Sequence, residues 1–166
     1  MLKENGLSCE VAAGHSLGEY SALVLAGALD FADAVRIVRK RGQFMQEAVP
    51  VGEGSMAAVL GLESDKIIDI CRTVEAECGE AVQAVNFNCP GQVVIAGSVG
   101  AVDKALAALK EAGAKRAVLL PVSAPFHSTL MQPASKRLAE VFETITFHDA
   151  KIPVVANVTA VSYTHL

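Results

Sequence analysis

The sequence has 166 residues, of which 52% are hydrophobic, and this is enough apolar material for a sizeable core and one domain or slightly more. The net charge of −4 and the pI near 5.5 give no overall basic character, which argues against a nucleic-acid partner. The apolar runs are short and interrupted by charges, so we expect no segment that crosses a membrane.

The first part of the chain predicts a strand, a tight turn and two helices. Residues 11–13 form a short apolar run, and residues 14–18 read Gly-His-Ser-Leu-Gly. Residues 19–26 are helix formers. A second helix, with Asp30 as a suitable N-cap, is expected over residues 30–48, because Pro50 follows it.

The middle of the chain predicts the order β-α-β-β-α-β, which is the ferredoxin-like arrangement. Ser98 is a suitable N-cap for the second helix of this unit, and Pro90-Gly91 is typical of a turn between two strands. The predicted strands are residues 55–60, 82–85, 93–96 and 117–120, and the predicted helices are residues 63–78 and 98–113.

This order predicts a small subdomain inserted into a larger α/β domain. Residues 54–121 form the ferredoxin-like subdomain, and residues 1–53 and 122–160 form the larger domain. Residues 161–166 are expected to be a tail outside this fold. In the larger domain the chain continues with a loop, a helix and a strand, at residues 122–129, 133–142 and 153–157.

The four cysteines form no C-x-x-C pair and have no histidines at zinc-ligand spacing, so we expect reduced thiols and no metal site. The first six residues lack the basic and apolar regions of a signal peptide. We therefore expect a cytoplasmic protein.

The pentapeptide at residues 14–18 matches G-x-S-x-G between a strand and a helix, the context of a nucleophile elbow. The flanking glycines suit a sharp turn that leaves no room for side chains. Ser16 would be the nucleophile, and the N–H of Leu17 at the helix N-terminus would stabilise an oxyanion. The alternative is a tight turn whose serine merely caps the helix.

An arginine continues the apolar stripe of the second helix. Arg41 and Met45 follow this stripe in 3.6-residue steps, and an inward guanidinium needs an anionic partner. The alternatives are an ion pair with a protein carboxylate, or a side chain that extends to solvent. The stripe consists of Phe31, Ala34, Val35 and Val38.

Four blocks of sequence resemble, in the same order, the malonyl-CoA:acyl-carrier-protein transacylases and the acyltransferase domains of polyketide synthases. The likeness extends to about residue 159. The resemblance implies an α/β fold in which a partial α/β-hydrolase-like parallel-sheet domain carries the ferredoxin-like insertion. The blocks are Gly-His-Ser-Leu-Gly-Glu-Tyr at 14–20, Arg-Gly-Gln-Phe-Met-Gln at 41–46, Asn-Phe-Asn-Cys-Pro-Gly-Gln at 86–92 and Pro-Phe-His-Ser at 125–128.

The resemblance implies transfer of a malonyl group from malonyl-CoA to the phosphopantetheine thiol of acyl carrier protein, in fatty acid biosynthesis. Ser16 would carry the malonyl group and His127 would be its general base, in a Ser-His dyad without an aspartate. Arg41 would bind the free carboxylate of the malonyl group as a fork. No cofactor is implied.

Further residues receive weaker assignments from the same resemblance. Phe126 would help to exclude an α-methyl branch, and Met45 would touch the acyl group; both could instead be core residues. Asn86 would line the cleft between the two domains, or have only a structural role in the turn that follows it. His15 neighbours the nucleophile in sequence, but adjacent side chains on a tight turn diverge, so we read it as a structural or a site-lining residue. His148 and His165 are read as surface residues.

The family's domain has a Gly-Gln-Gly turn before the serine, which supplies a second oxyanion donor, and further elements after residue 159. We therefore expect a sequence truncated at both ends and weakly active or inactive alone. The alternatives are a polyketide acyltransferase and a non-catalytic remnant that binds acyl carrier protein. An α/β-hydrolase fits less well, since it expects a Ser-Asp-His order. Candidate basic patches for the carrier protein are Arg36, Arg39 and Lys40, or Lys115 and Arg116.

Overall fold

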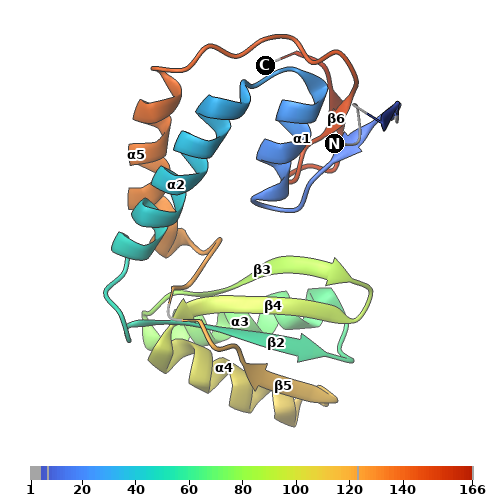
Figure 1. Cartoon of the computed structure of the whole chain (residues 1–166). Coiled ribbons are helices and arrows are strands. Elements are labelled where there is room, and N and C mark those ends of the chain that lie inside the picture. Colours follow the sequence, from blue (N-terminus) through green and yellow to red (C-terminus); the bar gives the residue numbers. More distant parts are fainter. Residues whose placement is uncertain (1–4, 7, 123, 166) are drawn as a thin grey trace. The chain divides into compact units, whose positions relative to one another are not determined.

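The structure is a computed structural model that describes residues 5–6, 8–122 and 124–165 (Figure 1). Parts of the predicted loop at 122–129 and of the predicted tail at 161–166 lie outside the described residues. The chain divides into two compact units, Met1–Gly42 with Leu138–Leu166, and Gln43–Arg137. The second unit contains the predicted ferredoxin-like residues and the segments that flank them.

The first unit is built on a small sheet. Strand β1 (Ala12–Ala13) pairs in parallel with β6 (Val154–Val155), and β6 pairs antiparallel with β7 (Ser162–Tyr163). Helix α1 (Gly18–Ala26) packs on β1 and β6 (Figure 1). The predicted strands at both ends of the chain are confirmed, although each has two residues. β7 lies in the segment that was expected to be a tail.

Helix α2 (Phe31–Glu47) confirms the second predicted helix, but its inward face differs from the predicted stripe. Ala34 and Ile37 are buried, whereas Phe31 and Val35 are 73% and 53% exposed. The prediction of the stripe was wrong at these two positions because apolar residues occupy two adjacent faces of the helix. Arg41 follows Ile37 by one turn and is half-buried.

The second unit has the predicted β-α-β-β-α-β order. Its sheet has the strand order β3-β4-β2-β5, with antiparallel pairing throughout. The first and third strands of the unit are therefore central, as a ferredoxin-like fold requires. The elements are β2 (Gly54–Leu60), α3 (Ser64–Cys78), β3 (Val82–Cys89), β4 (Gln92–Ser98), α4 (Val99–Glu111) and β5 (Arg116–Leu119).

Helices α3 and α4 cover one face of this sheet (Figure 1). Ile67, Ile95 and Leu109 are fully buried between helices and sheet, and each contributes about 1.5–3 kcal/mol by burial. Ser98 accepts a hydrogen bond from the Ala101 N–H at 3.4 Å, which confirms it as the N-cap of α4. The periodic pattern thus identified this unit correctly.

After β5 the chain forms a short 3₁₀ turn, η2 (Thr129–Met131), and helix α5 (Gln132–Phe142). The predicted helix at residues 133–142 is confirmed. Among the described helices, none is long and apolar enough to span a lipid bilayer.

Candidate active site

The turn between β1 and α1 places Ser16 in a backbone conformation that non-glycine residues rarely adopt. Its φ is 51°, in the left-handed region. Gly14 approaches the start of α1 so closely that a Cβ on it would lie 2.0 Å from the carbonyl atoms of Gly18. No side chain fits there. This sharp strand-to-helix turn has the geometry of a nucleophile elbow.

A polar network fixes the elbow to the end of β6. The Ser16 N–H donates to Oδ1 of Asn157 at 2.9 Å, and the Asn157 N–H donates to Oε2 of Glu19 at 3.4 Å. The Tyr163 hydroxyl donates to Oε1 of the same carboxylate at 3.1 Å. Burial and this hydrogen bond raise the pKa of Tyr163 to about 12, so its hydroxyl remains a donor at neutral pH.

The guanidinium of Arg41 lies directly against the candidate nucleophile. Its Nη2 donates to Ser16 Oγ at 2.7 Å. Its Cζ lies 5.9 Å from the ring centroid of Tyr20, within the range of a cation–π interaction. Burial raises the pKa of Tyr20, an effect that Arg41 opposes in part. The arrangement places a fixed cation where an acyl group on Ser16 would form.

The two neighbours of Ser16 in the turn have different surroundings. Leu17 is the N-cap of α1 and is 48% exposed, so its N–H belongs to the group of amides at the helix N-terminus. His15 is exposed, and its carbonyl accepts from the Gly18 N–H at 2.9 Å. The roles of Leu17 as oxyanion donor and of His15 as a site-lining residue stay predictions.

His127 belongs to the second unit and also has a left-handed backbone, with φ of 66°. The Pro125 carbonyl accepts from Ser128 Oγ at 2.7 Å and from the Ser128 N–H at 3.3 Å, which closes a tight turn around His127. Pro125 is fully buried, and a Cβ on Gly54 would lie 2.3 Å from its Cδ. The turn is thus anchored on β2.

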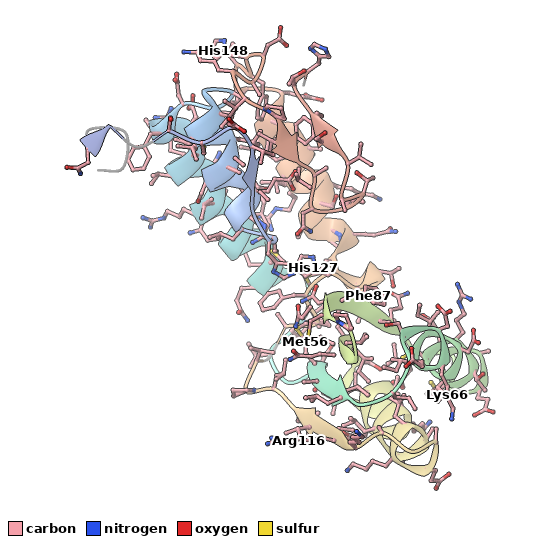
Figure 2. The ribbon with its side chains drawn as sticks, turned by 90° about the vertical axis from the view of Figure 1, so that its right-hand side faces the viewer. Met56, Lys66, Phe87, Arg116, His127 and His148 are labelled. Atoms are coloured by element: carbon pink, nitrogen blue, oxygen red, sulfur yellow. The ribbon has the colours of Figure 1, made fainter. Side chains whose placement is uncertain are left out.

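His127 itself is exposed and lines a pocket of about 390 Å³ within the second unit. Figure 2 shows His127 and Phe87, which both line this pocket. Arg72, Glu75 and Gln83 contribute charged and polar side chains to it, and the rest of its lining is mostly apolar. A histidine in this setting has polar neighbours and access to solvent.

The remaining predicted site residues also lie in the second unit. Phe126 packs beside Met56 on the sheet face opposite the helices. Met45 and Asn86 are half-buried, on α2 and β3. Ser16 and Arg41 are therefore in contact within the first unit, whereas the convergence of His127, Phe126, Met45 and Asn86 on Ser16 stays a prediction.

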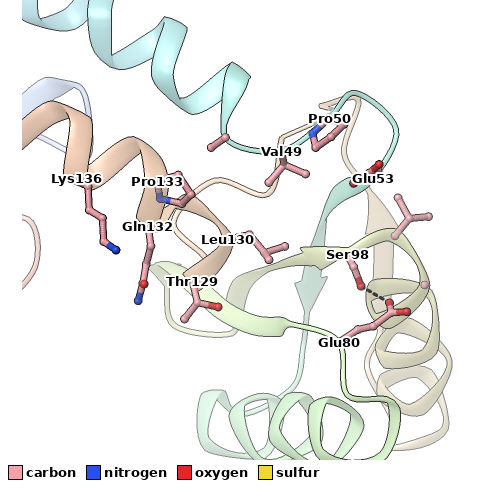
Figure 3. A pocket seen from close by; sticks show the side chains of 13 residues that line it. Val49, Pro50, Glu53, Glu80, Ser98, Thr129, Leu130, Gln132, Pro133 and Lys136 are labelled. Carbon is pink, nitrogen blue, oxygen red and sulfur yellow. Dashed lines mark hydrogen bonds between the residues drawn. The ribbon is translucent and has the colours of Figure 1, made fainter.

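A larger hollow of about 760 Å³ lies elsewhere in the second unit, between the N-terminus of α4 and the start of α5 (Figure 3). Ser98 donates to Glu80 at its rim. It contains none of the predicted site residues. Among the described residues no group of three His, Cys, Asp or Glu side chains is placed to hold a metal ion.

Comparison with known proteins decides the family. Residues 1–164 match the acyl transferase domain. The chain belongs to this family. It is 54% identical over 158 residues to the malonyl CoA-acyl carrier protein transacylase of Bacillus subtilis, and 57% identical over 156 residues to that of Escherichia coli K12. These matches cover 95% and 94% of the chain and half of each relative.

The fold of this acyl transferase chain is shared with solved relatives. A malonyl-transacylase solved in complex with its type II PKS acyl-carrier protein superposes with a TM-score of 0.94, at 50% identity, over 98% of this chain and 52% of that one. The predicted fold class is confirmed: a partial α/β-hydrolase-like parallel-sheet domain with a ferredoxin-like subdomain. The chain spans about half the length of its relatives.

Three residues of this acyl transferase site were missed from the sequence: Asn157, Glu19 and Tyr20. Glu19 and Tyr20 follow the serine pentapeptide directly and belong to the first block of the resemblance, so that block contained the signal. Asn157 follows β6, which is parallel to β1. The carboxyl ends of parallel strands meet at one sheet edge, so a polar residue directly after the second strand was a candidate site residue.

Proposed function

We propose that this chain is part of an [acyl-carrier-protein] S-malonyltransferase that works in fatty acid biosynthesis. The whole enzyme would move a malonyl group from malonyl-CoA to the phosphopantetheine thiol of acyl carrier protein. The names of the relatives and the four sequence blocks support the reaction. The contact between Arg41 and Ser16 carries the assignment of the substrate.

The reaction has two half-reactions. His127 takes the proton of Ser16 Oγ, which attacks the thioester carbonyl of malonyl-CoA. The Leu17 N–H stabilises the oxyanion of the tetrahedral intermediate. The C–S bond breaks, CoA leaves with the proton from His127, and malonyl-serine remains. The phosphopantetheine thiol then gives its proton to His127 and attacks this ester, and Ser16 recovers a proton as the product leaves.

Arg41 supplies selectivity for an acyl group that ends in a carboxylate. Its guanidinium contacts Ser16 Oγ at 2.7 Å, so the acyl chain of malonyl-serine begins beside a cation. The free carboxylate can accept two parallel hydrogen bonds from such a fork. An acetyl group has no carboxylate and leaves the cation unpaired, which costs binding in a half-buried site.

We further propose that the reaction needs no cofactor, because transfer between two thiols and a serine involves no oxidation or reduction. All four cysteines are free thiols in the structure. Such thiols persist in a reducing compartment, which supports a cytoplasmic location.

The test is the intact mass of the protein after incubation with malonyl-CoA and rapid quenching. The full-length enzyme should gain one malonyl group, which peptide mapping places on Ser16, and Ser16→Ala should gain none. The 166-residue chain alone is expected to form the adduct weakly or not at all. Absence of an adduct on the full-length protein would favour the non-catalytic remnant that binds acyl carrier protein.

A second candidate is the acyltransferase of a polyketide pathway. It is favoured by the relative that was solved with a type II PKS acyl-carrier protein. Carrier proteins of both kinds, each bearing phosphopantetheine, should be offered to the malonylated enzyme. Faster transfer to the polyketide carrier would move the assignment to that pathway.

A further inference from the structure

One side chain fastens the segment that follows His127 to the ferredoxin-like sheet. Gln83 on β3 accepts from the Thr129 N–H at 2.9 Å through Oε1. Its Nε2 donates to Thr129 Oγ1 at 3.2 Å and to Glu75 Oε1 at 3.3 Å. Gln83 thus links helix α3, strand β3 and the start of η2.

The chemistry of these partners fixes the orientation of the Gln83 amide. A backbone N–H can only donate, so the atom that faces Thr129 N is the amide oxygen. The nitrogen then faces Oε1 of Glu75, to which it donates. The two amide hydrogens therefore have separate acceptors, and Glu75 holds Gln83 in the orientation that binds Thr129.

This clamp lies two residues from His127. The left-handed backbone of His127 persists only where the residues on both sides are held in place. Buried Pro125, packed on Gly54, holds the first side. The two hydrogen bonds between Gln83 and Thr129 hold the second side. Gln83, Glu75 and His127 also line the same pocket.

We propose that Gln83, oriented by Glu75, is a positioning residue that fixes the turn of His127 for proton transfer. This inference rests on the proposed role of His127 as general base. Gln83 acts through the backbone of Thr129 and the Ser128 turn and touches no reacting atom. Its loss should therefore lower the rate of the chemical step and leave the binding of malonyl-CoA unchanged.

The test reverses the polarity of the hydrogen bond between Gln83 and Glu75 in the full-length enzyme. Gln83→Glu places a second carboxylate against Glu75 and should lower kcat for malonyl transfer by about 10–100-fold, since small misplacements of a catalytic group have effects of this size. KM for malonyl-CoA should stay within about twofold. Adding Glu75→Gln should restore kcat to within about threefold, because the amide introduced on α3 then donates to the carboxylate introduced on β3.

A matched control removes a charge from the same helix without touching the clamp. Glu77 is exposed on α3, and Glu77→Gln in the Gln83→Glu background should give no rescue. Gln83→Met removes all three hydrogen bonds without adding charge, and should show the same loss of kcat. It keeps the test valid should Gln83→Glu fail to fold.

Three outcomes overturn the inference. The first is unchanged kcat in Gln83→Glu and Gln83→Met, and the second is equal rescue by Glu77→Gln and Glu75→Gln. The third is a loss of kcat that parallels a fall in the thermal midpoint of unfolding and is not rescued by Glu75→Gln. His127→Ala separates this result from failure of the proposed function. If His127→Ala keeps full activity, the role of His127 itself is wrong; if it is inactive while the Gln83 variants are fully active, only the positioning role is wrong.

Discussion

The two units of the chain each hold one candidate catalytic residue in a left-handed backbone, and they do so by different means. Ser16, with φ of 51°, sits in a turn closed by direct backbone contact between Gly14 and Gly18. His127, with φ of 66°, sits in a turn held by a buried proline and by side-chain hydrogen bonds. Such backbone conformations cost about 1–3 kcal/mol each.

The two turns should therefore respond differently to substitution. Backbone contact at the serine elbow leaves no room for even one methyl group, so the response to substitution there is all or none. The histidine turn depends on several separate contacts, so removing one should give a graded loss. Variants at the two turns, and at Arg41 beside Ser16, can therefore test this difference.

The largest effect is expected from Gly14→Ala. The added methyl group would lie 2.0 Å from the carbonyl atoms of Gly18, and backbone atoms cannot move aside as a flexible side chain can. We expect a loss of about 3 kcal/mol or more in the free energy of unfolding, measured by urea titration, and no malonyl adduct on Ser16.

Gly18→Ala is the matched control, since a Cβ at Gly18 meets no atom within 4 Å. Gly18 is the first residue of α1, so alanine should be neutral or stabilise the helix by up to about 1 kcal/mol. Equal tolerance of the two substitutions would contradict the backbone-contact account of the elbow.

The next effect is a change of specificity in Arg41→Ala. Loss of a charged hydrogen-bond donor costs about 1.5–3 kcal/mol, so kcat/KM for malonyl-CoA should fall by roughly 10–100-fold. Acetyl transfer should fall far less. Arg36→Ala on the same helix is the control, because that side chain is 67% exposed and pairs with Asp33 at the surface. Arg36 is a candidate contact for the carrier protein, so the control is read from kcat/KM for malonyl-CoA, which reports the half-reaction before the carrier binds. Equal losses with both substrates would refute the carboxylate-binding role of Arg41.

Most elements of the fold were predictable because their patterns are local. The helical spacing of Ile67, Cys71 and Val74 predicted α3, and the turn at Pro90-Gly91 predicted the β3–β4 hairpin. Strand β3 extends to Cys89, beyond the predicted end at Val85, since pairing with β4 outweighs the weak strand propensity of its asparagines.

The site was predictable only where its residues stand in local sequence motifs. The serine turn and Arg41 stand in recognisable blocks, and their contact fits the prediction of an inward guanidinium. Asn157 lies 141 residues from Ser16, and Gln83 lies 46 residues from Thr129. Such hydrogen bonds depend on strand pairing and loop packing, so no local pattern predicts them.

Gly54→Ala tests the histidine turn in the same way that Gly14→Ala tests the elbow. Its methyl group would lie 2.3 Å from Pro125 Cδ, so the proline ring must shift. Overpacking of this kind costs about 1–3 kcal/mol, which thermal or urea unfolding can measure. Gly42→Ala, where a Cβ meets nothing within 4 Å, should not destabilise. A loss as complete as that of Gly14→Ala would remove the contrast between the two turns.

The smallest effect is expected at Tyr20, whose ring lies 5.9 Å from the Arg41 guanidinium. Burial raises the pKa of Tyr20, so the phenol stays neutral and the cation meets an uncharged ring face. Tyr20→Leu should raise KM for malonyl-CoA by about two- to fivefold, the equivalent of about 0.5–1 kcal/mol, while Tyr20→Phe should leave it unchanged. Because the ring face orients Arg41, acetyl transfer should be unaffected in both variants. A rise in KM in Tyr20→Phe equal to that in Tyr20→Leu would instead assign the effect to the hydroxyl, and the cation–π account of Arg41 would fail.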